Sequence, residues 1–180
     1  MEIKMKKVIA LISLAVILLT ASSCKSNENF NFEIKDGEVG YHELGLYFKL
    51  PENFEKKNAY SEIEMFYTDG DASFFYNVYS GEAIEEKLGL EPDITVEDYT
   101  KKFIIFNALE MDYEYDEERD RTTFGYVYTY PDGEIDPERY IYIIMRGTEH
   151  LYVITMSCDE ASYPKYKDMF DELMEIIYAE

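Results

Sequence analysis

"RYIYIIMRGTEHLYVITMSC", Arg139–Cys158, is the stretch that decides the fold of this 180-residue chain. Its two apolar runs, "YIYIIM" and "LYVITM", are rich in the β-branched and aromatic residues that favour strands. The turn signal "RGTE" between them predicts antiparallel pairing, because parallel strands need a long crossover connection. Both runs are apolar at successive positions, and hence on both faces of a pleated sheet. We therefore predict two central strands that are covered on each side.

Shorter runs on the N-terminal side predict the rest of the sheet. Residues 61–68 and 72–80 have the composition of two strands, and "TDGD", Thr68–Asp71, is a turn signal between them, so the pair is expected to form a hairpin. A second turn signal, "YPDGEIDP", precedes Arg139. The remaining strand-like runs lie at residues 45–51, 111–118 and 122–130.

Two segments have helical spacing instead. In Thr95–Leu109, apolar residues recur three and four apart, and Thr95 followed by Asp98 is a capping-box-like start. In Ser162–Glu180 the apolar stripe has the same spacing, and Pro164 stands in the first turn, where proline is tolerated. Residues 81–90 predict a short additional turn of helix. The predicted stripes are Val96, Tyr99, Phe103 and Phe106 in the first segment and Tyr166, Phe170, Leu173 and Ile177 in the second.

These elements predict an α+β domain over residues 40–180: a mostly antiparallel sheet of about six strands with one helix on each face, an α/β/α sandwich. The order of elements, from "GLYFKLPENF" to the closing "LYVITMSCDEASYPKYKDMFDEL", resembles the PsbP-like fold, which is found in small bacterial lipoproteins and in an extrinsic subunit of photosystem II. The resemblance implies a binding or assembly module rather than an enzyme. Some plant members carry metal-binding histidines, but this chain has only His42 and His150, so no such cluster carries over.

The amino end has the pattern of an export signal. Three lysines make Met1–Lys7 positive, and the uncharged run "VIALISLAVILL" follows at Val8–Leu19. As a helix this run rises about 18 Å, too little for the roughly 30 Å hydrocarbon core of a bilayer. A positive start, a short apolar middle and small residues at the end are typical of a secretory signal peptide, here residues 1–23.

"ASSC", Ala21–Cys24, closes this segment and resembles the lipobox of bacterial lipoproteins, in which small residues precede an invariant cysteine. Ala21 stands where the family usually has leucine. In the family, the cysteine receives a diacylglyceryl group and becomes the new N-terminus. The resemblance implies lipid attachment at Cys24, with two acyl chains for stable anchoring. It also implies an exported protein on the outer face of the bacterial cytoplasmic membrane, or in the periplasm or outer membrane of a host with two membranes.

The charge of the chain excludes one class of partner. The whole chain has 17 basic and 38 acidic residues; residues 1–23 hold three lysines and one glutamate, which leaves 14 and 37, a net charge of −23. Such a domain is repelled by nucleic acid and by anionic lipid headgroups. Residues 24–39 are polar and lack a sustained period, so we predict a flexible tether that holds the folded domain off the membrane.

No pattern in the sequence predicts a catalytic residue, a metal site or a cofactor. The motifs G-x-S-x-G, H-E-x-x-H, C-x-x-C and the P-loop are all missing. Cys158 is the only cysteine besides Cys24, and we expect a small buried hydrophobe, because no spacing links it to His42 or His150. The acidic clusters at residues 68–71, 112–123 and 130–138 lack the ligand pattern of a calcium loop and are expected to form turns and solvated surface.

Three functions stay open at this point. The first, which we favour, is a membrane-tethered, non-catalytic module of the cell envelope that binds a protein or a small ligand. The second is a glycan-binding domain that uses tyrosine platforms, for which the chain has 18 tyrosines but no tryptophan. An exposed row of tyrosines would favour it. The third is a hydrolase that works with two carboxylates, and a pocket holding two acids with raised pKa would favour it.

Overall fold

The computed structural model describes residues 30–58, 64–131, 133 and 135–180. The predicted signal peptide, Cys24 and the first residues of the predicted tether, 25–29, lie outside the described residues. Residues 31–180 form one unit. Its first strand begins at Glu38, inside the segment predicted as tether; the boundary at residue 40 stays a prediction. No helix in the described residues is both long and apolar enough to cross a bilayer.

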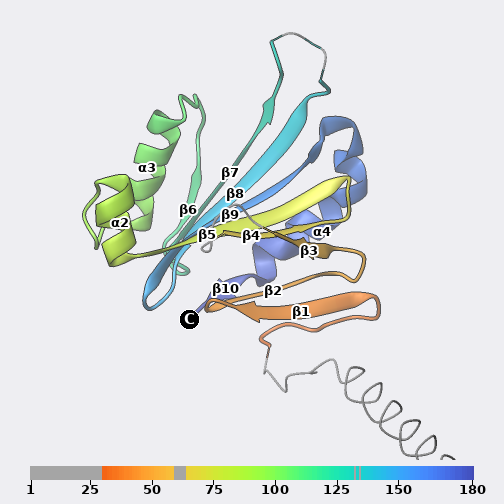
Figure 1. Ribbon diagram of the computed structural model, residues 1–180, viewed down its shortest axis with the longest axis horizontal. Coiled ribbons are helices and arrows are strands. Elements are labelled where there is room, and N and C mark those ends of the chain that lie inside the picture. Colours follow the sequence, from red (N-terminus) through yellow and green to blue (C-terminus); the bar gives the residue numbers. More distant parts are fainter. Residues whose placement is uncertain (1–29, 59–63, 132, 134) are drawn as a thin grey trace, which may run out of the picture. The chain divides into compact units, whose positions relative to one another are not determined.

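A seven-stranded antiparallel sheet forms the centre of the domain (Figure 1). The two strands of the opening stretch lie side by side in it, with Ile143 opposite Ile154 and Ile141 opposite Met156. The predicted hairpin of residues 64–80 is confirmed, and Asp69 accepts backbone hydrogen bonds from Asp71 and Ala72 in its turn. In spatial order the strands are β3 (Glu55–Lys57), β4 (Glu64–Thr68), β5 (Ala72–Ser80), β9 (His150–Asp159), β8 (Glu138–Arg146), β7 (Arg121–Tyr128) and β6 (Glu114–Asp116).

One face of this sheet is covered by α4 (Tyr163–Ile176) and by a second, three-stranded sheet. A 3₁₀ turn, Glu160–Ser162, leads into α4. The second sheet has the order β1 (Glu38–Glu43), β2 (Leu46–Pro51) and β10 (Tyr178–Ala179). The prediction that the last helix extends to Glu180 is wrong. Ile177 is extended and buried, and the two residues after it pair with β2, so the chain end closes the small sheet instead.

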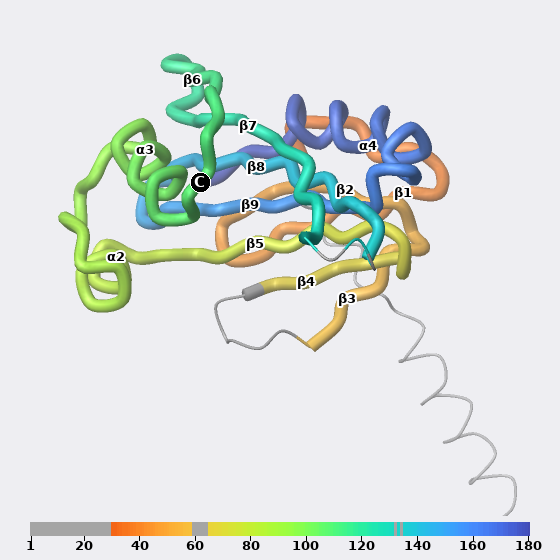
Figure 2. The backbone as a smooth tube through the Cα atoms, turned by 90° about the horizontal axis from the view of Figure 1, so that it is seen from above, coloured from red at the N-terminus to blue at the C-terminus, as the bar shows by residue number. Residues whose placement is uncertain are grey.

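The opposite face is covered by α2 (Gly81–Leu88) and α3 (Val96–Phe106) at one end of the strands, as Figures 1 and 2 show. The predicted cap is present: the Thr95 hydroxyl accepts a hydrogen bond from the Asp98 amide. Two helices therefore share this face, where one was predicted. Phe106 departs from the predicted stripe, because its side chain is 89% exposed.

The sheet divides the apolar core into two parts, which confirms the α+β fold with cover on both faces. Alternate residues of each strand point to opposite sides, so β8 contributes Ile143 to one part and Ile144 to the other. The α4 side is the larger and includes Phe48, Phe74, Tyr76, Ile143, Ile154 and Phe170. The α2 and α3 side includes Ile84, Val96, Ile144, Leu151 and Val153.

Candidate functional site

The face that carries α2 and α3 is covered over only part of its area. Leu151 and Val153 of β9 pack beneath the two helices, and two residues further along, Thr155 and Ser157 point to the same side. α2 and α3 lie over the end of the strands where Leu151 stands, away from the end that carries Ser157 (Figures 1 and 2). We call the remaining part the open face. Its residues are Phe66 of β4, Ser73 and Phe75 of β5, Thr155 and Ser157 of β9, Tyr140 and Tyr142 of β8, and Tyr126 and Tyr128 of β7.

Strand register builds this surface in rows. In one row Phe75, Thr155 and Tyr142 stand directly opposite one another across three strands. In the next row Ser73, Ser157 and Tyr140 do the same, and Tyr126 follows on β7. Large aromatic side chains that are only partly buried thus alternate with small polar ones, and Tyr128 at the margin is 44% exposed.

Four rings on β7 and β8 are stacked in series. The ring centroids of Phe124 and Tyr142 lie 5.0 Å apart, those of Tyr142 and Tyr126 6.1 Å, and those of Tyr126 and Tyr140 5.4 Å. The three angles between their planes are 11°, 6° and 22°. Offset stacking contributes roughly 0.5–1.5 kcal/mol per pair beyond burial. The row is therefore a rigid, preformed surface, and part of each ring face is used by the neighbouring ring.

Glu138 joins the tyrosine row through hydrogen bonds. Its Oε2 accepts a hydrogen bond from the Tyr130 hydroxyl at 3.0 Å and another from the Tyr140 hydroxyl. Burial, and then the hydrogen bond to Glu138, raise the pKa of Tyr140 far above the ordinary tyrosine value; burial likewise raises that of Tyr142. Both hydroxyls stay protonated at physiological pH and can donate hydrogen bonds, but neither can act as a base.

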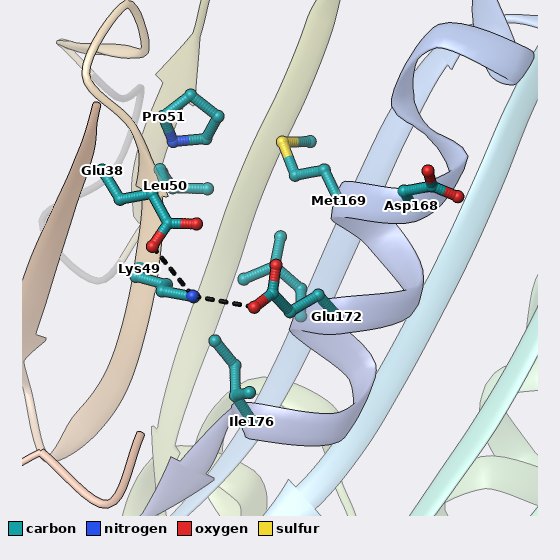
Figure 3. A pocket seen from close by; sticks show the side chains of 9 residues that line it. Glu38, Lys49, Leu50, Pro51, Asp168, Met169, Glu172 and Ile176 are labelled. Carbon is teal, nitrogen blue, oxygen red and sulfur yellow. Dashed lines mark hydrogen bonds and ion pairs between the residues drawn. The ribbon is translucent and has the colours of Figure 1, made fainter. Parts of the chain in front are cut away.

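A second candidate is an acidic groove of about 190 Å³ between β2 and α4 (Figure 3). Lys49, only 4% exposed, lies in its wall, and its Nζ is 2.9 Å from Glu38 Oε2 and 2.8 Å from Glu172 Oε1. The same Nζ donates to the Glu33 carbonyl at 3.0 Å. Burial opposes the charge of Lys49, but the hydrogen bonds and ion pairs with the two glutamates outweigh it and raise its pKa. An ammonium group with three acceptors and a raised pKa is a structural clamp and no nucleophile.

Glu172 of this groove does not have the environment of a hydrolase acid. A general acid needs a raised pKa, whereas hydrogen bonds from Lys49 and Lys35 lower the pKa of Glu172. Within the described residues, every carboxyl group with a shifted pKa is shifted downward: Glu55, Asp69, Glu97, Glu160 and Glu172.

A third hollow of about 420 Å³ lies beside β7, on the side of the sheet that faces α4. Gly125 of β7, Ile141 of β8 and Met174 of α4 line it. Two acids line it as well: Asp112 stands just before β6, and Glu114 is the first residue of β6. We call it the β7 groove. It is treated below as a separate surface.

The residues singled out in the sequence do not assemble into a catalytic site. Cys158 is buried and unoxidised, and burial raises its pKa to about 11, which matches the predicted small buried hydrophobe. His150 stands at the other end of the same strand, roughly 26 Å away for eight extended residues. Over the part of the chain that the structure describes, no three His, Cys, Asp or Glu side chains are placed to hold a metal ion.

The open face was not predicted, although the sequence carries a signal for it. In "TTFGYVYTY", Phe124, Tyr126 and Tyr128 alternate and so point to one side of the strand. In "RYIYIIM", Tyr140 and Tyr142 alternate in the same way. Periodicity alone shows that these rings share a face within each strand. The pairing register is needed to show that the two sets share one face.

Comparison with known proteins supports the fold and no more. No protein-family model and no curated protein sequence matches this chain. The solution structure of cyanobacterial PsbP from Synechocystis is similar, with 11% identity, coverage of 89% of this chain and 99% of that chain, and a TM-score of 0.53. The Ran-binding protein Mog1p of Saccharomyces cerevisiae gives 10% identity, coverage of 82% and 96%, and a TM-score of 0.49. The fold is PsbP-like, as the order of elements predicted.

Proposed function

We propose that this protein is a non-catalytic binding or assembly module of the bacterial cell envelope. It is exported and held at the membrane by a diacylglyceryl group on Cys24. It binds a protein or a small ligand on its open face. The observation that carries the proposal is the stacked row of Tyr126, Tyr140 and Tyr142, which begins at the margin of α3, where Tyr142 packs against Phe103, and continues onto the open face. The surface is preformed and needs no ordering on binding.

The chemistry of the open face favours recognition over catalysis. Tyrosine is enriched at the centres of protein interfaces, where its ring is buried and its hydroxyl finds a partner. The hydroxyls here are neutral, and that of Tyr140 donates to Glu138 and can accept a hydrogen bond from a ligand. Ser73 and Ser157 add small polar groups between the rings. Since the chain carries a strong negative charge, nucleic acid is an unsuitable partner.

Affinity capture with matched variants tests this proposal. Full-length protein, tagged and solubilised in detergent, is used to capture partners from envelope extracts, which are quantified by mass spectrometry. Tyr126→Ser/Tyr140→Ser removes the stacked row. The control Tyr115→Ser changes an exposed tyrosine that stacks on no described ring. We expect proteins captured by the wild type and the control to fall about tenfold with the double variant, a loss of about 1.4 kcal/mol. Equal capture by a double variant that still unfolds cooperatively would refute a role for the open face.

Glycan binding is the second candidate, and the contiguous, partly exposed tyrosine row is the observation that favours it. Sugars stack on open ring faces, however, and here the rings stack on one another, so we place this function second. The chain has no tryptophan, so its fluorescence comes from its 18 tyrosines, and only a change that disappears in the variant can be assigned to the row. A saturable fluorescence change on titration with soluble cell-wall glycan fragments, lost in Tyr126→Ser/Tyr140→Ser, would move this candidate to first place.

Anchoring is tested separately from binding. Cells expressing the wild type or Cys24→Ser are grown with an alkyne-bearing fatty acid, and the purified proteins are examined for the label. We expect label on the wild type and none on Cys24→Ser, which should also leave the membrane fraction. A wild-type protein without label would refute the lipid anchor. It would not bear on the proposed binding at the open face.

A further inference from the structure

Part of β7 is an unpaired sheet edge. β6 pairs only with Arg121–Thr123, whereas β7 continues to Tyr128 (Figure 2). Along Gly125–Tyr128 no strand in the described residues lies on the outer side. In an antiparallel sheet, alternate residues of an edge strand direct their amide and carbonyl groups outward. This segment therefore offers a row of hydrogen-bonding groups to another chain.

The edge lacks the usual protection against pairing. Natural edge strands carry lysines, prolines or bulges that block a second chain. The outer half of β7 instead reads Gly125-Tyr126-Val127-Tyr128, and its exposed side chains include Val127 and Tyr128. A valine and two tyrosines are the residue types that form favourable cross-strand pairs with β-branched partners.

The β7 groove runs beside this edge and would receive the side chains of an added strand. Gly125 leaves the floor open above Ile141, and a Cβ at Gly125 would come within 3.0 Å of the Tyr140 carbonyl oxygen. The backbone that approaches Gly125 is that of β8. For an added strand, what matters is that the missing side chain leaves space in the groove. With Met174 on one side, the floor is apolar, and Asp112 and Glu114 give it an acidic end. An apolar channel that ends in carboxylates suits the aliphatic stem and charged head of lysine or arginine.

Charge also selects the occupant. The groove contains one cation of its own, Arg139, whose guanidinium is held by Glu160 through two hydrogen bonds of 2.7 Å and stacks over Tyr163. Asp112 and Glu114 are the carboxylates that line this groove, and Arg139 is already paired with Glu160. A second copy of this chain, with a net charge of −21, would be repelled, whereas a basic segment is attracted.

We propose that the outer edge of β7 binds an extended peptide segment, in which basic and β-branched residues alternate, as an eighth strand of the central sheet. Its backbone pairs with Gly125–Tyr128. The lysine or arginine side chains lie in the β7 groove and reach Asp112 and Glu114, and the β-branched side chains pack on Tyr126 and Tyr128. The proposal rests on the edge and the groove, and it holds whether or not the tyrosine row binds a partner of its own.

Binding of a defined peptide tests the proposal on the full-length chain in detergent. The probe is fluorescein-labelled Lys-Val-Lys-Val-Lys-Val-Lys, followed by fluorescence anisotropy. Asp112→Lys/Glu114→Lys should weaken its binding about tenfold or more, the size expected for removal of charge-assisted contacts. The matched control is Glu85→Lys/Glu86→Lys on α2, which changes the net charge equally at two exposed positions. We expect the control to weaken binding about twofold or less, because distant charges are screened.

Two further measurements test strand addition itself. The same peptide with N-methyl groups on alternate residues cannot pair along one edge, and we expect it to bind about tenfold more weakly. Hydrogen exchange on the wild type should show slowed amides within Gly125–Tyr128 when the probe is bound. Equal binding of the N-methylated peptide, unchanged exchange on β7, or equal loss in the two charge variants would overturn the proposal. Phe75→Ser, which removes an open-face ring on β5 that contacts neither Tyr126 nor Tyr128, should bind the probe like the wild type even if it loses the partner of the open face.

Discussion

Lys49 shows how one buried charge ties three parts of the domain together. Its ammonium group lies on β2, Glu38 begins β1 and Glu172 comes from α4, so the two ion pairs fix the small sheet against the helix. Its side chain is far more buried than the surface pairs on α3, such as Lys101 with Glu97. Buried pairs are costly to break because the remaining charges lose their partner, whereas exposed pairs contribute little.

Replacing Lys49 tests this role. Lys49→Met keeps the apolar stem, removes the cation that faces Glu38 and leaves Glu172 with only the exposed Lys35, and we expect the free energy of unfolding to fall by about 2–3 kcal/mol. Lys102→Met, at an exposed position on α3, is the control and should change it by about 0.5 kcal/mol or less. Urea unfolding followed by circular dichroism measures both. A stable Lys49→Met protein would show that the pairs do not hold β1 and β2 to α4.

The same cluster predicts a pH dependence. The pKa of Glu172 is lowered in the folded protein, so its stabilising contribution is fully present above its unfolded pKa of 4.5 and is lost as the pH falls through the lower folded value. Glu172→Gln removes this titration. We expect the wild type to exceed Glu172→Gln in unfolding free energy above about pH 5 and the difference to shrink toward about pH 3. A difference that stays constant over this range would contradict the assigned ion pairs.

At the scale of the element, α3 shows what spacing predicts and where it stops. The spacing of Val96, Tyr99 and Phe103 predicts that their side of the helix faces the sheet. Phe103 does pack against Phe124 and Tyr142. Phe106 continues the same spacing, but it is the last residue of the helix and its side chain is exposed. Ile104, outside the predicted stripe, is 8% exposed. Periodicity predicts which side of a helix faces the core. Burial of a given residue also requires a neighbouring element that packs against it.

Two substitutions in α3 separate these effects. Phe106→Ser should change the unfolding free energy by about 0.5 kcal/mol or less, since the ring is already in water. Ile104→Ser should lower it by about 3 kcal/mol, through lost burial and a buried hydroxyl. Thermal unfolding of both variants measures the difference. If Phe106→Ser destabilised the protein as much as Ile104→Ser, the exposed position of Phe106 would be wrong.

At the scale of the whole molecule, the two faces of the sheet are covered differently. α4 and the small sheet pack on one face, while α2 and α3 leave the open face on the other. Arg121 of β7 donates a hydrogen bond to the Met174 carbonyl in the last turn of α4, so the end of the helix is tied to the central sheet as well. The C-terminal segment thereby completes both the larger core and the small sheet.

Truncation tests this dependence. A chain that ends after Tyr163 loses α4 and β10 and uncovers one sheet face, and we expect no cooperative unfolding and strong binding of an apolar dye. A chain that ends after Ile177 loses only β10 and the last residue and serves as the control. We expect it to unfold cooperatively at a lower temperature, because Tyr178 and Ala179 no longer pair with β2. A longer truncation with a sharp unfolding transition would show that α4 is dispensable for the core.

Local sequence patterns predict the class of fold, the hairpin around Asp69, the cap at Thr95 and the buried state of Cys158. These features depend on periodicity, turn chemistry and capping, which act between residues a few positions apart. Three features could not be predicted in this way and are known only from the folded arrangement. Tyr126 and Tyr140 share an open face, Lys49 is buried between Glu38 and Glu172, and β7 extends beyond the end of β6. Each of these depends on register and on the length of elements far apart in the chain, because packing between distant segments sets which surfaces are covered.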